Sequence, residues 1–211
     1  MSLFKILFFV SNILGYIPLL SFFKKVNNKF KGLNFYIFLV AFSSFYELVF
    51  SYFLKFNVEI WFKVFSLLEF ILIMQIFFYQ KYRPKKFFFI FFFLFYMIVY
   101  LYILIYMNNY HFLLKDSFLN LIVFVFILLF SFFWLTKSLK SYELIKYTKI
   151  PFFYFLSGLI IYYVGIIFLS IFSLEIIKSD MSINQYWLLN IFFLIVFRIF
   201  IIISVWKKST V

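Results

Sequence analysis

Three ionisable residues interrupt the long apolar stretches of this sequence: Glu47, Glu69 and Arg198. Charged side chains are costly inside hydrocarbon, so each one there indicates a functional site or an ion cluster. A guanidinium can bind two carboxylates through its planar fork of donors. Alternatively, desolvation and a like-charged neighbour would leave one carboxyl protonated. We therefore expect one cluster of two carboxylates with an arginine between or beside them.

Further polar residues accompany these three at helical spacing. Ser44 and Ser51 stand three residues before and four after Glu47, which predicts a polar stripe on one helix face. Ser66 stands about one helical turn before Glu69. Asn190 stands about two turns before Arg198. The candidate intramembrane site comprises Glu47, Glu69, Arg198, Ser44, Ser51, Ser66 and Asn190.

Two interpretations of this cluster stay open. It either fastens three helices together, or it binds a ligand, a proton or an ion. Gly158 and Gly165 are seven residues apart and share one helix face, where a second helix can approach closely. We interpret this glycine pair as a helix-packing feature.

The composition places these residues in a membrane. The chain has 211 residues, of which 67% are hydrophobic and 13% are charged, whereas a soluble domain is about 25% charged. The apolar runs are continuous and lack the alternation of an outer-membrane barrel strand. Helices satisfy their backbone groups within the segment, so the sequence predicts an all-α bundle of transmembrane helices.

A membrane-spanning helix needs about 20 mainly apolar residues. Seven segments reach that length, and the short connections between them leave no room for a separate soluble domain. We predict one integral membrane domain over residues 1–211, with spans at about 3–23, 34–54, 60–80, 87–107, 117–136, 151–174 and 187–206.

Basic residues gather in alternate connections, which sets the orientation under the positive-inside rule. These connections are predicted to be cytoplasmic, which puts the N-terminus outside and the C-terminus inside. Trp61, Trp187, Trp134 and Trp206 fall near span ends, as expected for an interfacial belt. The basic connections carry Lys24, Lys25, Lys29, Lys31, Lys81, Arg83, Lys85, Lys86, Lys137, Lys140, Lys146 and Lys149, and the C-terminal tail adds Lys207 and Lys208.

The formal net charge of +13 does not indicate nucleic-acid binding here. The basic residues flank helix ends, where they orient the protein and attract anionic lipid head groups. We therefore expect partners in the lipid bilayer, in a cytoplasmic protein and in further copies of the chain, but no direct binding of nucleic acid.

Several kinds of chemistry lack the residues they require. The chain has no cysteine and one histidine, His111, which excludes thiolate sites and zinc sites built on imidazole clusters. It contains no nucleophile elbow, phosphate-binding glycine loop or His-Glu-x-x-His helix. We expect no enzyme activity, no metal and no cofactor.

Short motifs distributed over nearly the whole chain resemble those of a group of membrane proteins. These motifs are the stretch from Pro151 to Tyr162 with Gly158, the two intramembrane glutamates, and Trp187-Leu-Leu-Asn190. This pattern resembles uncharacterised seven-helix inner-membrane proteins of AT-rich bacteria, and the topology is similar to that of rhodopsin-like and receptor bundles in shape only. The resemblance implies a bacterial inner membrane and a sensory partner role.

Three functions remain in competition. The first is sensing or relaying a signal, in which the Glu/Arg cluster responds and the basic loops act on a cytoplasmic partner. The second is an accessory or effector protein of a CRISPR or phage-defence system, acting as an oligomer, a pore or a regulator of a nuclease. The third is a small transporter or an ion or proton pathway, although spans 1–3 and 5–7 show no repeat.

Overall fold

The computed structural model describes residues 3–23, 32–56, 59–80, 83–106, 112–140, 150–178 and 183–207. Within these ranges the chain is helical and contains no strand. Seven helices are long and apolar enough to cross a membrane, so the predicted number of spans is confirmed. The elements are α1 (Leu3–Tyr16), η1 (Ile17–Leu19), α2 (Leu20–Phe23), α3 (Leu33–Phe45), η2 (Tyr46–Phe53), α4 (Glu59–Phe78), α5 (Lys86–Tyr106), α6 (Phe112–Lys140), α7 (Pro151–Lys178) and α8 (Ile183–Trp206).

Two spans contain irregular turns with local causes. Pro18 lacks a backbone N–H and lies in the 3₁₀ turn η1, between α1 and α2. The second span changes from an α-helix to the π-helix η2 at Tyr46. The fifth span runs to Lys140, beyond the predicted end at residue 136, and two lysines occupy its last turn, where cations favour the C-terminal end of a helix dipole.

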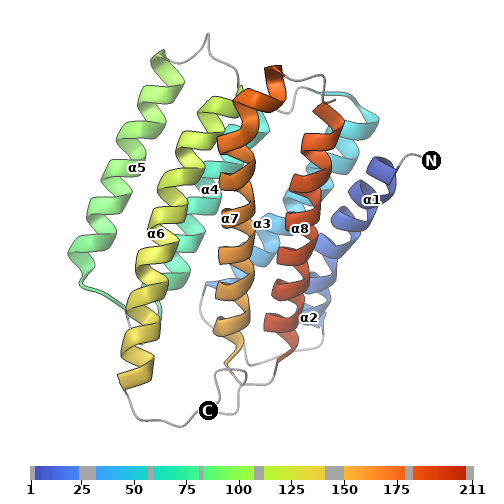
Figure 1. Cartoon of the computed structure of the whole chain (residues 1–211). Coiled ribbons are helices and arrows are strands. Elements are labelled where there is room, and N and C mark those ends of the chain that lie inside the picture. The colour runs from blue at the N-terminus through green and yellow to red at the C-terminus, as the bar shows by residue number, and fades with distance from the viewer. Residues whose placement is uncertain are drawn as a thin grey trace.

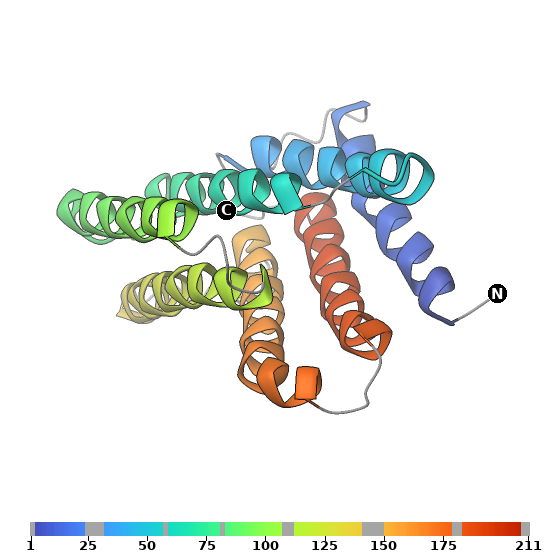
Figure 2. The ribbon, with the colours of Figure 1, turned by 90° about the horizontal axis from the view of Figure 1, so that it is seen from above.

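The helices run alternately up and down, so each connection lies at one of two ends (Figure 1). We name the end where α2 and α8 finish and α3, α5 and α7 begin the basic end, and the other the neutral end. Seen along the bundle, α3, α4 and α5 form one layer and α6, α7 and α8 lie opposite (Figure 2). The first helix, α1, packs against both α3 and α8.

An aromatic core joins the two layers. Phe70 of α4 stacks on Tyr96 of α5 with ring centroids 3.9 Å apart, and Phe126 of α6 packs edge-on against Phe70. Nearer the basic end, Phe77 of α4 contacts Phe152 of α7. Many large apolar side chains point outward instead, such as Phe87, which is 70% exposed. A surface of this kind suits contact with lipid chains.

Two of the four tryptophans face the interior of the protein. Trp61 and Trp134 are buried, and they pack on Tyr46 and Phe152 respectively. These two tryptophans therefore pack against other helices near the ends of their spans, and the interfacial belt stays a prediction.

The glycine pair of α7 faces α8. A methyl group at Gly158 would overlap the Cβ of Phe200, and one at Gly165 would overlap the ring of Phe193. The absence of side chains at these positions lets α7 and α8 pack closely, and this is the most extensive helix contact among the described residues.

We expect Gly158→Ala to destabilise the protein by about 1–3 kcal/mol, because the new methyl group overpacks the interface between α7 and α8. The measurement is reversible unfolding in mixed detergent micelles. Ser157→Ala, at the neighbouring position of the same helix, serves as the control and should cost less. Equal stability of Gly158→Ala and the wild type would show that the two helices can separate freely.

Candidate functional site

A cavity of about 630 Å³ lies between the two layers. Six of the seven predicted site residues line it: Glu47, Glu69, Arg198, Ser51, Ser66 and Asn190. Its wall also includes Ser11, Ser43, Tyr36, Tyr162, Ser117 and Asn120, together with aromatic side chains from α1, α4 and α8. The structure thus brings the three ionisable residues to one space, although they come from three separate spans.

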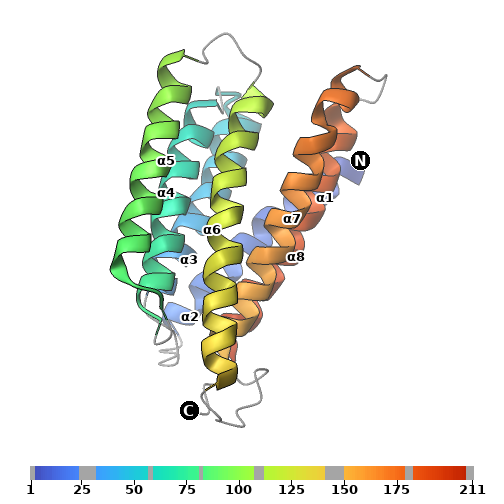
Figure 3. The same ribbon diagram turned by 60° about the vertical axis from the view of Figure 1, so that its left-hand side comes forward.

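The cavity extends from the middle of the bundle to the neutral end. Phe4, Phe62 and Trp187, which lie in the first turns of their spans at that end, belong to its wall. Figure 3 shows α7 and α8 leaning away from α4 and α6 toward this end. In the other direction the space ends near Tyr36 and Phe197. Beyond them the chain forms a closely packed core with Ile73, Phe155 and Ile201 among its buried members.

Glu47 occupies the first turn of the π-helix η2. Ser43 Oγ donates a hydrogen bond to Glu47 Oε1 at 3.2 Å, and Asn12 of α1 also hydrogen bonds to this carboxylate. Trp61 Nε1 donates in turn to Ser43 Oγ at 3.4 Å. Single π-helical turns often mark functional sites, and here the wider turn sets the direction of the glutamate.

The change of helix type corrects the predicted Ser44–Glu47–Ser51 stripe. Ser51 lines the cavity with Glu47, whereas Ser44 does not. Ser44 is buried and donates to the carbonyl of Val40 at 3.0 Å. The preceding residue, Ser43, contacts Glu47 instead, at the four-residue spacing that also makes side chains neighbours on a helix.

Arg198 is fixed by α1. It is 2% exposed, and its Nη1 donates to Ser11 Oγ at 2.9 Å. A methyl group at Gly15 would come within 3.4 Å of the Arg198 Cζ and would overlap the Ser44 hydroxyl. Gly15 therefore leaves the space that the guanidinium and this serine occupy.

The arginine does not bridge the two glutamates. No ion pair shorter than 4.0 Å joins it to either carboxylate within the described residues. Glu47 is the charged group that acts most strongly on Arg198, while Arg198 is not among the groups that act on Glu69. We therefore describe the single cluster expected from the sequence as a Glu47–Arg198 centre and a Glu69 centre in one cavity, with Tyr162 interacting electrostatically with all three residues.

The second centre is built from tyrosines. Glu69 is 6% exposed, and Tyr36 of α3 donates to its Oε1 at 2.8 Å. Tyr163 of α7 also interacts electrostatically with this carboxylate. A carboxylate that accepts several hydrogen bonds is stabilised in its ionised form. Three helices therefore meet at this one side chain.

The partners of the ionisable residues were not predicted. Tyr36 carries no distinguishing signal in a chain with 17 tyrosines, and neither does Ser43, whereas Tyr162 and Tyr163 stand out in the sequence as a polar pair between Gly158 and Gly165. The adjacent pair Ser11-Asn12 did carry one, since it is a polar pair in an otherwise apolar first span. Both residues are buried, and both contact the Glu47–Arg198 centre.

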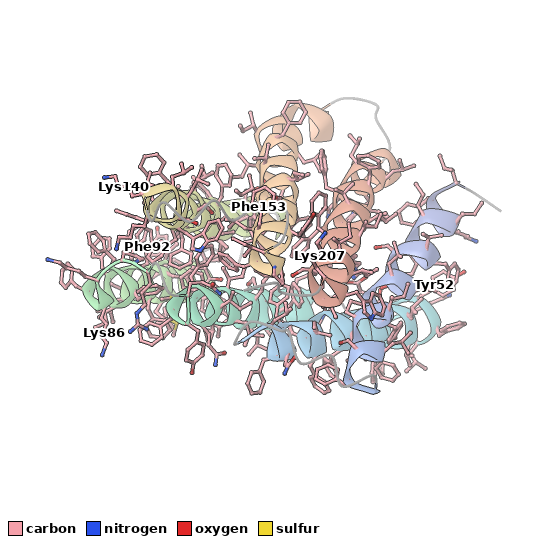
Figure 4. The ribbon with its side chains drawn as sticks, turned by 90° about the horizontal axis from the view of Figure 1, so that it is seen from below. Tyr52, Lys86, Phe92, Lys140, Phe153 and Lys207 are labelled. Carbon is pink, nitrogen blue, oxygen red and sulfur yellow. The ribbon has the colours of Figure 1, made fainter. Side chains whose placement is uncertain are left out.

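The described basic residues differ in what they contact. Arg83 donates to the carbonyl of Phe78, and Lys137 donates to the carbonyl of Arg83, so these two connect α4 and α6 at the basic end. Lys85, Lys86 and Lys140 are exposed, and Figure 4 shows the last two at the outer edge of the bundle. The other predicted basic residues, Lys24, Lys25, Lys29, Lys31, Lys81, Lys146 and Lys149, lie outside the described residues.

A double-mutant cycle tests whether the two centres are separate. We expect Arg198→Met and Glu47→Gln to be coupled by about 1–3 kcal/mol, since removal of one partner leaves the other charge buried alone. Arg198→Met and Glu69→Gln should be additive to within about 0.5 kcal/mol. Equilibrium unfolding of the single and double variants measures both energies. Stronger coupling to Glu69 than to Glu47 would contradict the assignment.

Comparison with known proteins identifies no relative of this chain. No protein-family model, no curated protein and no solved structure matches the chain. The function is therefore argued from the chemistry and geometry of the cavity.

Proposed function

We propose that this chain is a non-enzymatic membrane protein that senses a signal in its cavity and relays it to a cytoplasmic partner. One observation carries the proposal: Glu47, Glu69 and Arg198 line a single cavity of about 630 Å³. Ligand pockets in proteins are commonly about 300–1,000 Å³ in volume. Ionisable groups are costly in this environment, so their exposure to a common space favours binding over simple fastening.

The shape of the cavity favours a receptor. It reaches the neutral end through Phe4 and Trp187, and toward the basic end it is followed by the packed aromatic core. A ligand entering from the neutral end would reach both charged centres and go no further. In the proposed orientation the neutral end faces outward, so the signal would come from outside the cell.

The helices offer a mechanical path to the basic end. Arg198 lies in the cavity wall and shares α8 with Ser204, which donates to the carbonyl of Pro151 at 2.9 Å. Just beyond α8, Lys207 lies over the ring of Tyr154 on α7. A shift of α8 at Arg198 would therefore move the basic ends of α7 and α8. The exposed lysines there would present the change to a partner, and would also bind anionic lipid head groups.

A small transporter is the second candidate, because the cavity reaches the middle of the membrane-spanning segments. Transport requires a second state in which the same residues open to the basic end. Buried residues such as Ile73, Phe155 and Ile201 close the space toward the basic end, which speaks against a permanent pathway. No described residue favours the defence-system hypothesis.

We expect neutralisation of Glu47 to change the arrangement of helices at the basic end. Phe35 of α3 and Ile203 of α8 are exposed near that end, and the chain has no native cysteine. Spin labels on Phe35→Cys and Ile203→Cys should change their separation by about 2 Å when Glu47→Gln is added, as in known helix shifts. Pulsed electron resonance of the protein in nanodiscs measures the distance.

A second label pair provides the control for this experiment. Phe87 of α5 and Leu139 of α6 are also exposed near the basic end, and no residue of α5 lines the cavity. Their separation should stay constant in the Glu47→Gln background. If the Phe35–Ile203 separation is equally unchanged, the relay is refuted.

The proposed membrane is the bacterial inner membrane, with the N-terminus outside and the basic end in the cytoplasm. In intact cells, a membrane-impermeant thiol reagent should label Asn109→Cys, in the connection after α5, and leave Lys86→Cys unlabelled. Lysed cells should show labelling of both. The reverse pattern would invert the topology and place the cavity mouth in the cytoplasm.

A further inference from the structure

The charges around the cavity do not balance. Arg198 is the one lysine or arginine among the described residues that line it, and its closest electrostatic partner is Glu47. Glu69 has two tyrosine hydroxyls as partners and no cation. Hydrogen bonds stabilise a buried carboxylate but do not cancel its charge, which is expensive away from water. Glu69 is therefore a carboxyl group in the cavity wall that has no charged partner among the described residues.

An acceptor without a hydrogen-bond partner among the described residues also lines the cavity. Asn190 Oδ1 is buried and accepts no hydrogen bond among the described residues, and Asn190 lines the cavity. A buried acceptor without a donor costs about 1–3 kcal/mol. An ammonium group supplies several hydrogen-bond donors together with the positive charge that a carboxylate attracts.

The rest of the wall is mainly apolar and aromatic. Phe62 and Phe65 precede Glu69 on α4, and Trp187 lies parallel to Phe62 with ring centroids 6.1 Å apart. Tyr162 stacks on Phe197 with ring centroids 5.2 Å apart. Aromatic faces attract cations and flat apolar groups. The described residues include no cluster of three or more His, Cys, Asp or Glu side chains that could hold a metal ion.

We propose that the cavity binds an amphipathic organic amine in its protonated form. The ammonium group lies against Glu69, and the apolar body lies among Phe62, Phe65 and Trp187. This inference rests on the proposed function, since it names the class of ligand that the sensor would detect. The ammonium would supply the charge that the protein itself does not place beside Glu69.

Three probes of similar shape test the charge requirement. Tryptamine carries an ammonium, tryptophol a hydroxyl and indole-3-acetate a carboxylate on nearly the same indole body. Binding is measured by calorimetry at neutral pH, with the full chain in phosphatidylcholine nanodiscs and empty nanodiscs as the blank. We expect tryptamine to bind at least about tenfold more tightly than tryptophol, and indole-3-acetate to bind most weakly.

Two variants locate the interaction. Glu69→Gln should reduce tryptamine affinity by about tenfold or more and leave tryptophol affinity unchanged. Glu143→Gln removes a carboxylate from the connection between α6 and α7 and should change neither. If Glu69→Gln fails to fold, Tyr36→Phe removes one hydrogen bond to the carboxylate, and the order of the three probes on the wild type still decides the result.

The outcomes separate this inference from the proposed function. Equal affinities for all three probes, or no binding of tryptamine at millimolar concentration, would overturn the amine proposal. Preference for indole-3-acetate that is lost in Arg198→Met would also overturn it, because Arg198 Nε lacks an acceptor as well. None of these results would change the label distances that test the relay, so the relay stands or fails independently.

Discussion

The structure depends on one constraint: a charge within an apolar helix bundle must find polar partners on other helices. Arg198 finds Ser11, which is 187 positions away in the sequence. Glu69 finds Tyr36, which is 33 positions away. Each of these contacts fixes the rotation and height of two helices at once. Apolar contacts in lipid are less selective, since lipid chains are as apolar as the side chains they would replace.

This constraint divides the bundle into a closely packed half and a half that surrounds the cavity. Toward the basic end, aromatic residues such as Phe77 and Phe152 pack edge to face and close the interior. Toward the neutral end, the polar partners hold the helices around a cavity. The π-helix η2 belongs to this second half, because its wide turn directs Glu47 toward Ser43 and α1. The packed aromatic half holds the basic ends of the helices together, while the helices around the cavity are joined mainly by polar contacts.

The seven membrane-spanning helices could be predicted from the sequence, because seven long apolar runs separated by charged connections are accommodated in a bilayer as helices. The sequence also pointed to Glu47, Glu69 and Arg198, since charges in such runs are rare. It could not distinguish one centre from two, because that depends on which helices become neighbours. Nor could it predict that Ser43 rather than Ser44 contacts Glu47, since both positions are neighbours of Glu47 on a helix and only the packed structure selects one.

The central claim is that the ionisable residues surround a space that opens to one side of the membrane. Reactivity of Ser66→Cys toward a small cationic methanethiosulfonate reagent tests it most directly, because Ser66 lines the cavity one turn from Glu69. Ser131→Cys, at a buried position of α6 outside the cavity, is the reference. We predict rapid modification of Ser66→Cys from the neutral end and none of Ser131→Cys. Equally slow modification of both would show that the three charges lie in a closed interior and serve only to join helices.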